Sequence, residues 1–262
     1  MVYWVFLTGM RRRGFLKSLL VGGVSIGIYS FLEPHFKIDV TRVSLDLGAG
    51  KKVMFVSDTH FHGVDGREEQ VIKMVSRYVD DVDMVIVAGD LYDEYTSSMH
   101  TLKRFLEVVG DKAYIVLGNH EHWASNKYPL DEALDILIGN GATILLNRSL
   151  WVDNLSIGGI DWYNDDPALG RKYLSSVGAV DILISHTPDI FSDAPGRYRL
   201  LLAGHTHGGQ VFYGFGVVTP SRYGYISGLY ESEGRRMYIT RGLGEIIPVR
   251  VASSREITLI DI

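Results

Sequence analysis

The chain contains no cysteine among its 262 residues. Disulfide bonds, thiolate metal ligands and thiol nucleophiles are therefore excluded, and the redox state of the compartment is left open. Proline is also scarce, with seven residues, and no linker rich in proline, glycine or serine splits the folded part. The length and the 46% content of hydrophobic residues predict one globular domain with a substantial core.

An excess of positive charge is missing as well. The chain has 26 Lys and Arg against 31 Asp and Glu, which gives a formal net charge of −5 and a pI of about 6.0. A surface that binds duplex nucleic acid usually shows clustered Lys and Arg and a basic pI. Nucleic acid is therefore a poor candidate for the main substrate.

The N-terminal residues 1–33 differ in composition from the rest. A basic head at Arg11–Arg13 precedes an apolar stretch at 19–32, which is shorter than the roughly 20 residues that a membrane-spanning helix needs. The segment 12–17 resembles the twin-arginine export signal, which a receptor reads. We expect export by this route. The alternatives are a basic amphipathic helix on the cytoplasmic face of the membrane and a buried core helix.

No small-x-small cleavage site follows the apolar stretch, because Ser30-Phe31-Leu32 is bulky, so the segment is expected to remain as a membrane anchor. The expected location is outside the cytoplasm, at the cell membrane, with the twin-arginine export machinery as a partner. Met10 is a second candidate for the initiator. Pro34 disfavours helix continuation, and the folded domain is predicted to cover residues 34–262.

Candidate metal ligands follow short apolar runs five times. The runs, which are typical of buried strands, are 52–56, 84–87, 113–117, 181–184 and 199–203. The loops after them read Asp58-Thr59-His60, Gly89-Asp90, Gly118-Asn119-His120-Glu121, His186 and Gly204-His205-Thr206-His207. Ligands bind at the carboxyl ends of strands in open α/β sheets. We therefore expect these five loops to meet at one edge.

The remaining elements complete an α/β pattern. Helical spacing of apolar residues predicts helices at 67–79, 97–109 and 130–138. Further strands are predicted at 36–47, 143–146, 149–152, 155–160, 211–213, 237–240 and 255–260. Together these elements predict two packed mixed sheets flanked by helices.

Carboxylate, imidazole and amide groups are the ligands that divalent hydrolytic metals take in proteins. Two such metals lie roughly 3.5–4 Å apart and need a ligand that both can share, usually a carboxylate. The five loops together carry enough such groups for two ions, with one histidine left over for proton transfer.

The order Asp-x-His, Gly-Asp, Gly-Asn-His-Glu, His and Gly-His-x-His resembles the calcineurin-like metallophosphoesterases. The motifs span residues 52–210, and the fold expectation covers 36–262. The resemblance implies a four-layer α/β/β/α sandwich. It also implies that Asp58, His60 and His207 hold one metal ion, that Asn119, His186 and His205 hold a second, and that Asp90 bridges them.

The resemblance further implies a reaction. A hydroxide held between two divalent metals, which could be Mn, Zn or Fe, attacks phosphorus in line. His120, beside Asn119, is implied to bind a phosphoryl oxygen or to protonate the leaving oxygen as a general acid.

Other side chains leave two readings open. Glu121 could hydrogen-bond a histidine or cap a helix. His62 could reach the mouth of the site or lie solvated in a loop, and Asp93 could support a ligand or cap a turn. No arginine follows Gly89-Asp90, so the phosphate clamp that several relatives carry there is absent. Trp162, Tyr163 and the stretch 212–215 could line an apolar pocket or belong to the core.

The expected function is hydrolysis of phosphate monoesters or diesters, with cell-envelope or phospholipid substrates. The run Gly-His-Thr-His-Gly-Gly-Gln at 204–210 and Arg241–Gly244 resemble the twin-arginine-exported branch of the family. The alternative is a membrane-associated UDP-diacylglucosamine pyrophosphohydrolase of lipid A synthesis, which needs a cytoplasmic active site. A scaffold without activity is disfavoured because every ligand position is filled.

Overall fold

The computed structural model describes Ser25 and residues 37–63, 65–209, 212–213, 216–217, 219–246, 250 and 253–262. The export or anchor segment expected at residues 1–33, together with the domain boundary at Pro34, lies outside the described residues apart from Ser25. In the described part of the chain, no helix is both long and apolar enough to cross a bilayer.

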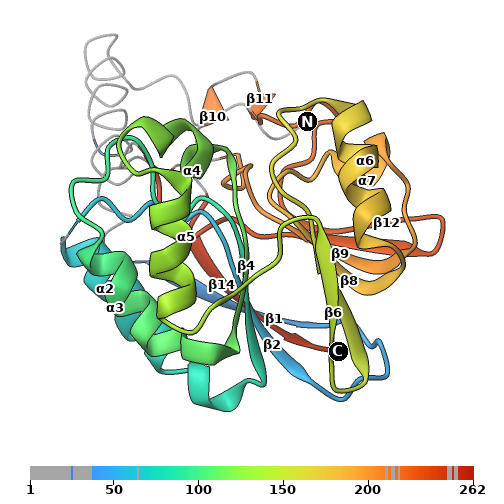
Figure 1. Ribbon diagram of the computed structural model, residues 1–262, viewed down its shortest axis with the longest axis horizontal. Helices are drawn as coiled ribbons and strands as arrows, with labels where there is room; N and C mark the ends of the chain where they lie inside the picture. The colour runs from blue at the N-terminus through green and yellow to red at the C-terminus, as the bar shows by residue number, and fades with distance from the viewer. Residues whose placement is uncertain are drawn as a thin grey trace, which may run out of the picture.

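Two six-stranded sheets form the centre of the molecule (Figure 1). The first sheet has the order β1 (Ile38–Ser44), β14 (Arg255–Asp261), β2 (Lys52–Val56), β3 (Met84–Ala88), β4 (Ala113–Val116), β5 (Thr143–Ile144). The second has the order β12 (Gly228–Ser232), β13 (Arg235–Ile239), β9 (Tyr198–Ala203), β8 (Val180–Ser185), β7 (Leu155–Gly159), β6 (Arg148–Val152). A small ribbon pairs β10 (Phe212–Tyr213) with β11 (Gly216–Val217).

Helices cover the outer face of each sheet. The helices are α2 (Gly66–Ser76), α3 (His100–Val109), α4 (Asn119–Trp123), α5 (Leu130–Gly139), α6 (Pro167–Val177) and α7 (Ile190–Asp193). Figure 1 shows α2, α3 and α5 on the side of the first sheet and α6 and α7 on the side of the second. The layers are therefore helix, sheet, sheet, helix, and the expected α/β/β/α sandwich is confirmed.

Period-2 alternation along the central strands explains the layers. Val53 and Phe55 of β2 point into the core between the sheets, where they join residues of the second sheet such as Ile184 and Leu202. Met54 and Val56 point the other way, into the core under α2, α3 and α5. Both faces of β2 are thus buried, as its continuous apolar run predicts.

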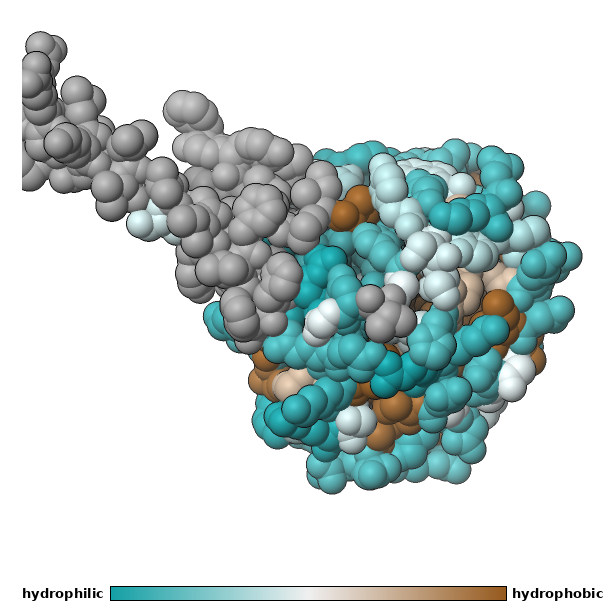
Figure 2. All heavy atoms as spheres, turned by 90° about the vertical axis from the view of Figure 1, so that its left-hand side faces the viewer, coloured by the Kyte–Doolittle hydropathy of each residue, from teal (hydrophilic) through white to brown (hydrophobic). Residues whose placement is uncertain are grey.

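The outer face of this helical layer is exposed to solvent. Figure 2 shows the side on which α2 and α3 lie, where hydrophilic residues predominate and apolar residues appear as separate patches. On α3, Leu102, Phe105 and Leu106 are buried and Lys103 is exposed. This division by helical period is what the sequence predicts for a helix that packs on a sheet.

The predicted strands and helices are present within about three residues of their expected ends. The strand expected at 36–47 covers only Ile38–Ser44, and the helix expected from residue 97 begins at His100. Helices α4, α6 and α7 and strands β11 and β12 were not predicted. Helix α6 has recognisable start residues, since Asp166 accepts the N–H of Ala168 and Pro167 occupies the first turn.

The C-terminal strand lies inside the first sheet. β14 lies between β1 and β2, parallel to the former and antiparallel to the latter. A segment about 200 residues away from β2 in the chain therefore supplies its neighbour. The last strand therefore lies in the same sheet as the first.

Candidate functional site

The structure brings all eight predicted site residues together at the carboxyl ends of five strands. β2, β3 and β4 are parallel, so the loops after them emerge at one edge of the first sheet. β8 and β9 are also parallel and place their loops at one edge of the second sheet. The residues that meet there are Asp58, His60, Asp90, Asn119, His120, His186, His205 and His207.

Asp90 lies at the centre of this group. Its Oδ2 is 3.1 Å from Nε2 of His186 and 3.9 Å from Nε2 of His60. Its Oδ1 accepts the backbone N–H of His120 at 2.9 Å. The carboxylate is almost fully buried. One carboxylate therefore lies close to a histidine from each of the two sheets.

On one side of Asp90, polar atoms converge on Nε2 of His186. The Nδ1–H of His186 donates to the carbonyl of Ala88 at 2.7 Å, which leaves the Nε2 lone pair free. That Nε2 is 3.0 Å from Oδ1 of Asn119 and 3.0 Å from Nδ1 of His205. The carbonyl of Ala88 thus fixes which imidazole nitrogen faces the site.

The other side holds Asp58, His60 and His207. The Nε2 of His207 is 3.4 Å from Oδ1 of Asp58, and its Nδ1 is 3.2 Å from the carbonyl of Gly244. The rings of His60 and His207 are stacked, with centroids 5.2 Å apart. The Nε2 of His60 is buried and has no hydrogen-bond partner. A buried polar atom without a partner costs about 1–3 kcal/mol, so its position calls for a ligand.

These residues fit cations and fit little else. Three groups each place their donor atoms within 4.8 Å of one another, and their residues are buried except His205 and His207, which are partly buried. They are Asp58–His60–His207, His60–Asp90–His120 and Asp90–His186–His205. Carboxylate and imidazole atoms lie close together in all three, which is unfavourable without positive charge between them. Mixed oxygen and nitrogen ligation suits Mn, Zn or Fe.

The electrostatics of the cluster follow from this crowding. Burial opposes protonation of His186, but the Asp90 carboxylate outweighs it and raises the pKa of His186 to about 10. Burial lowers the pKa of His205 to about 4, with His186 adding to the effect. The Asp90 carboxylate thus favours positive charge at Nε2 of His186, which a metal ion would supply in place of a proton.

The backbone is strained where the ligands lie. Asp58, His60, Asp90, His205 and His207 all have positive φ, between 43° and 71°. Non-glycine residues rarely adopt this region, and such strain concentrates at functional sites. Five of the seven predicted metal ligands are therefore held in a conformation that only the surrounding structure can enforce.

Two glycines allow the loops to approach one another closely. A Cβ at Gly118 would lie 2.2 Å from Oδ1 of Asp90, and one at Gly204 would lie 2.5 Å from Oδ2 of Asp58. Both contacts are far shorter than van der Waals separation. The glycines in the Gly-Asn-His-Glu and Gly-His-x-His motifs thus leave room for the carboxylates.

Glu121 supports the site through the backbone. Its carboxylate accepts N–H groups of Asp90 at 3.0 Å, Leu91 at 2.5 Å and Gly118 at 2.8 Å. The prediction of a hydrogen bond to a histidine is therefore wrong, and the helix-cap alternative is right for Gly118, which precedes α4. Glu121 also ties the Asp90 loop to the next loop.

Asp93 and His62 act together beside His60. Oδ2 of Asp93 is 2.9 Å from Nδ1 of His60 and 2.7 Å from Nε2 of His62, while Oδ1 accepts the N–H of Tyr95 at 2.8 Å. Burial acts against ionisation of Asp93, but the two histidines hold its pKa well below the ordinary value. Both roles considered for Asp93 are present. His62 is tied to the site and is not a solvated loop residue.

Glu94 was missed by the sequence reasoning. Its Oε2 is 2.7 Å from Nδ1 of His120, so it orients the imidazole predicted to transfer a proton. The sequence feature that could have indicated it is an acidic residue four positions after Asp90, in the loop where several relatives carry an arginine. Among the aromatics, Tyr163 belongs to the core, with 0% exposure, and the side chains of 212–215 lie outside the described residues.

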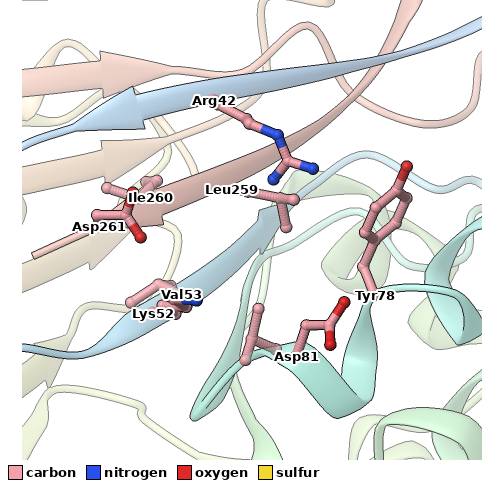
Figure 3. Close-up of a pocket in the computed structure, with 9 residues that line it drawn as sticks. Arg42, Lys52, Val53, Tyr78, Asp81, Leu259, Ile260 and Asp261 are labelled. Carbon is pink, nitrogen blue, oxygen red and sulfur yellow. The ribbon is translucent and has the colours of Figure 1, made fainter.

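A separate pocket lies at the opposite end of the first sheet (Figure 3). It has a volume of about 430 Å³ and is lined by residues of β1, β2 and β14 and by the helical segments after α2. Arg42, Tyr78 and Asp81 point into it from two sides. None of the eight site residues lines it, so it is distinct from the metal-ligand cluster.

Comparison with known proteins agrees with this geometry. The family model "Calcineurin-like phosphoesterase" matches residues 51–209, which contain all five motifs. The chain belongs to the calcineurin-like phosphoesterase family. It is therefore a metal-dependent phosphoric ester hydrolase of a family that uses two divalent metal ions.

Two relatives of this phosphoesterase match over nearly their whole length. An uncharacterized metallophosphoesterase of Aquifex aeolicus is 29% identical over 91% of this chain and 97% of its own. A phosphodiesterase of Escherichia coli, YaeI, is 24% identical over 96% of this chain and 98% of its own. Among solved structures, TT1561 of Thermus thermophilus aligns at 10% identity, with a TM-score of 0.48, over 75% of this chain and 92% of its own.

The close approach of Gly118 to Asp90 predicts a defect in metal binding. In a Gly118→Ala variant the added methyl group displaces the Asp90 carboxylate, so we expect the bound metal to fall from about two ions per chain to about one or fewer. Elemental analysis of the purified protein measures this content. Gly139→Ala is the matched control, because its Cβ meets open space. Unchanged metal content in Gly118→Ala would show that the carboxylate position does not matter.

Proposed function

We propose that the seven predicted ligands divide into two sets that share Asp90. Asp58, His60 and His207 form one set. Asn119, His186 and His205 form the other. The observation that carries the proposal is the position of the Asp90 carboxylate, 3.1 Å from His186 and 3.9 Å from His60, because a shared carboxylate is what two adjacent divalent metals need.

Divalent metals in such a site supply a deprotonated water near neutral pH and offset the charge that develops on the phosphoryl oxygens. The protein holds the ligands ready through the Ala88 and Gly244 carbonyls, which orient His186 and His207. Asp93 orients His60 in the same way. Each imidazole therefore presents one chosen nitrogen without reorganisation when substrate arrives.

His120 is proposed as the general acid. Glu94 occupies its Nδ1, so Nε2 is the nitrogen left for the substrate. The backbone N–H of His120 is also tied to Asp90, which fixes the residue relative to the ligands. A group held in this way can give a proton to the leaving oxygen, a contribution of about 10²–10⁴ in rate.

We infer that the substrates are phosphate monoesters or diesters of the cell envelope, including phospholipids. Two observations support this inference. The N-terminal sequence carries a basic head and an apolar stretch, which point to the membrane. The Escherichia coli relative that matches over nearly its whole length is named a phosphodiesterase.

The test of this inference is an assay of the manganese-loaded protein with aryl phosphates, phosphodiesters, phosphatidyl lipids and UDP-diacylglucosamine. We expect turnover of the phosphoesters. Turnover of UDP-diacylglucosamine alone would replace this proposal with the lipid A alternative.

The proposed location is outside the cytoplasm and at the membrane, reached by the twin-arginine route. A reporter that is active only outside the cytoplasm, fused after residue 40, should become active in cells with the export machinery. Replacing Arg12 and Arg13 by lysine should silence it, because the receptor reads the arginine pair. A fusion that stays silent with the arginines intact would place the enzyme on the cytoplasmic face, where UDP-sugars are made.

Loss of the imidazole at position 120 should separate turnover from metal binding. In His120→Ala we expect kcat to fall by about 10²–10⁴ while both metals stay bound, since the scheme gives this residue no ligand role. Steady-state kinetics on a phosphodiester together with elemental analysis measure the two effects. His100→Ala, an exposed position on α3, is the control. Loss of metal from His120→Ala would make the residue a ligand.

A further inference from the structure

An exposed tryptophan stands beside the proposed general acid. Trp123 is the last residue of α4, one turn after His120, so the two side chains share a face of the helix. Their rings meet at 74° with centroids 4.8 Å apart. The indole of Trp123 is nevertheless 51% exposed. An exposed indole beside the proposed general acid offers a flat apolar surface close to the position of the leaving oxygen.

A second tryptophan reaches the same place from the other sheet. Trp162 follows β7, and its ring meets that of Trp123 at 89° with centroids 5.7 Å apart. Two indoles at right angles form a corner beside His120. The corner spans both sheets, because α4 follows β4 of the first sheet.

Asp161 holds the second tryptophan in position. Its Oδ1 accepts the backbone N–H of Trp162 at 2.8 Å and is 2.8 Å from Nε2 of His122. The rings of His122 and Trp162 lie 5.5 Å apart. The backbone N–H of Asp161 in turn donates to Oδ1 of Asn147 at 3.0 Å. This network orients Trp162 before any substrate is present.

The acidic groups beside the corner are paired with histidines, and one lysine lies near them: Lys127 donates from Nζ to the backbone carbonyl of Glu94 at 3.4 Å. Glu94 binds His120 and Asp161 binds His122. The cation–ring contacts of the described residues all involve other rings than these two tryptophans. Arg67 is engaged by Asp65 and Glu245. The groups nearest the two indoles are therefore the carboxylates of Glu94 and Asp161 with their histidines, and Lys127 lies further out on the Glu94 side.

We propose that Trp123 and Trp162 form the subsite for the leaving group, and that this group is uncharged and apolar or aromatic where it joins the leaving oxygen. The inference rests on the proposed function: if His120 protonates the leaving oxygen, the atoms attached to that oxygen lie against Trp123. Indole faces bind flat and apolar groups well.

The test compares two monoesters on the full-length, manganese-loaded enzyme. Phenyl phosphate has an aromatic leaving group, and glycerol 3-phosphate has a small polar one. In Trp123→Ala we expect kcat/KM for phenyl phosphate to fall about tenfold, mainly through KM, and that for glycerol 3-phosphate to change less than about twofold. Trp162→Ala should also lower kcat/KM for phenyl phosphate relative to that for glycerol 3-phosphate. Because Trp162 is not part of α4, this second result excludes a local structural defect in α4 as the cause.

Trp151→Ala is the matched control, because Trp151 is 72% exposed on the edge strand β6, and it should leave both substrates unchanged. Equal losses for the two substrates in Trp123→Ala would overturn the subsite. So would a loss confined to phospholipids in vesicles, since the two tryptophans would then contact the membrane.

A binding experiment separates this inference from the proposed function. Phenylphosphonate should bind the metal-loaded protein more tightly than methylphosphonate, and Trp123→Ala should remove that difference, as measured by calorimetry. If the enzyme turns over no phosphoester, the proposed function fails, and this comparison still decides the subsite. Equal affinity of the two phosphonates for the unsubstituted protein would contradict it.

Discussion

The mutual repulsion of buried lone pairs around Asp90 is the constraint on which the rest of the structure depends. Nε2 of His186 lies within about 3 Å of Asp90, Asn119 and His205, while Nε2 of His60 faces Asp90 without any partner. Such an arrangement is costly unless positive charge lies between the atoms. The fold therefore provides a cation site. Hydrogen bonds to the outer imidazole nitrogens of His60, His186 and His207 leave the nitrogens that face Asp90 or Asp58 available to a cation.

The fold meets this constraint by ending parallel strands at one edge. The tight loops after β2, β3 and β9 force Asp58, Asp90 and His207 into positive φ, and that strain is offset by the surrounding packing and by carboxylates that collect backbone N–H groups. Glu121 alone accepts three of them. Because β14 inserts beside β2, the loop after β13 is also brought in, and Gly244 supplies the carbonyl that orients His207. Stability and function thus use the same contacts.

Much of this could be predicted from the sequence, because the deciding signals are local. An apolar run followed directly by Asp or His predicts both a strand and the position of a ligand at its end, so the five loops and the two-sheet fold were predicted correctly. The sequence does not show which groups that are distant in the chain form pairs. Glu94 was missed because its role depends on the three-dimensional approach of two loops to His120. The misplaced role of Glu121 has the same origin, since its partners are backbone groups that carry no residue-specific signal. The position of β14 between β1 and β2 likewise depends on long-range pairing.

The central claim is that two metal ions lie on either side of the Asp90 carboxylate. Anomalous diffraction from crystals of the protein grown with Mn²⁺ tests it directly, because manganese gives a strong signal and the lighter atoms of the ligands do not. The account predicts two peaks roughly 3.5–4 Å apart, one beside Asp58, His60 and His207 and the other beside Asn119, His186 and His205, with Asp90 touching both. A single peak, or two peaks without Asp90 between them, would contradict it.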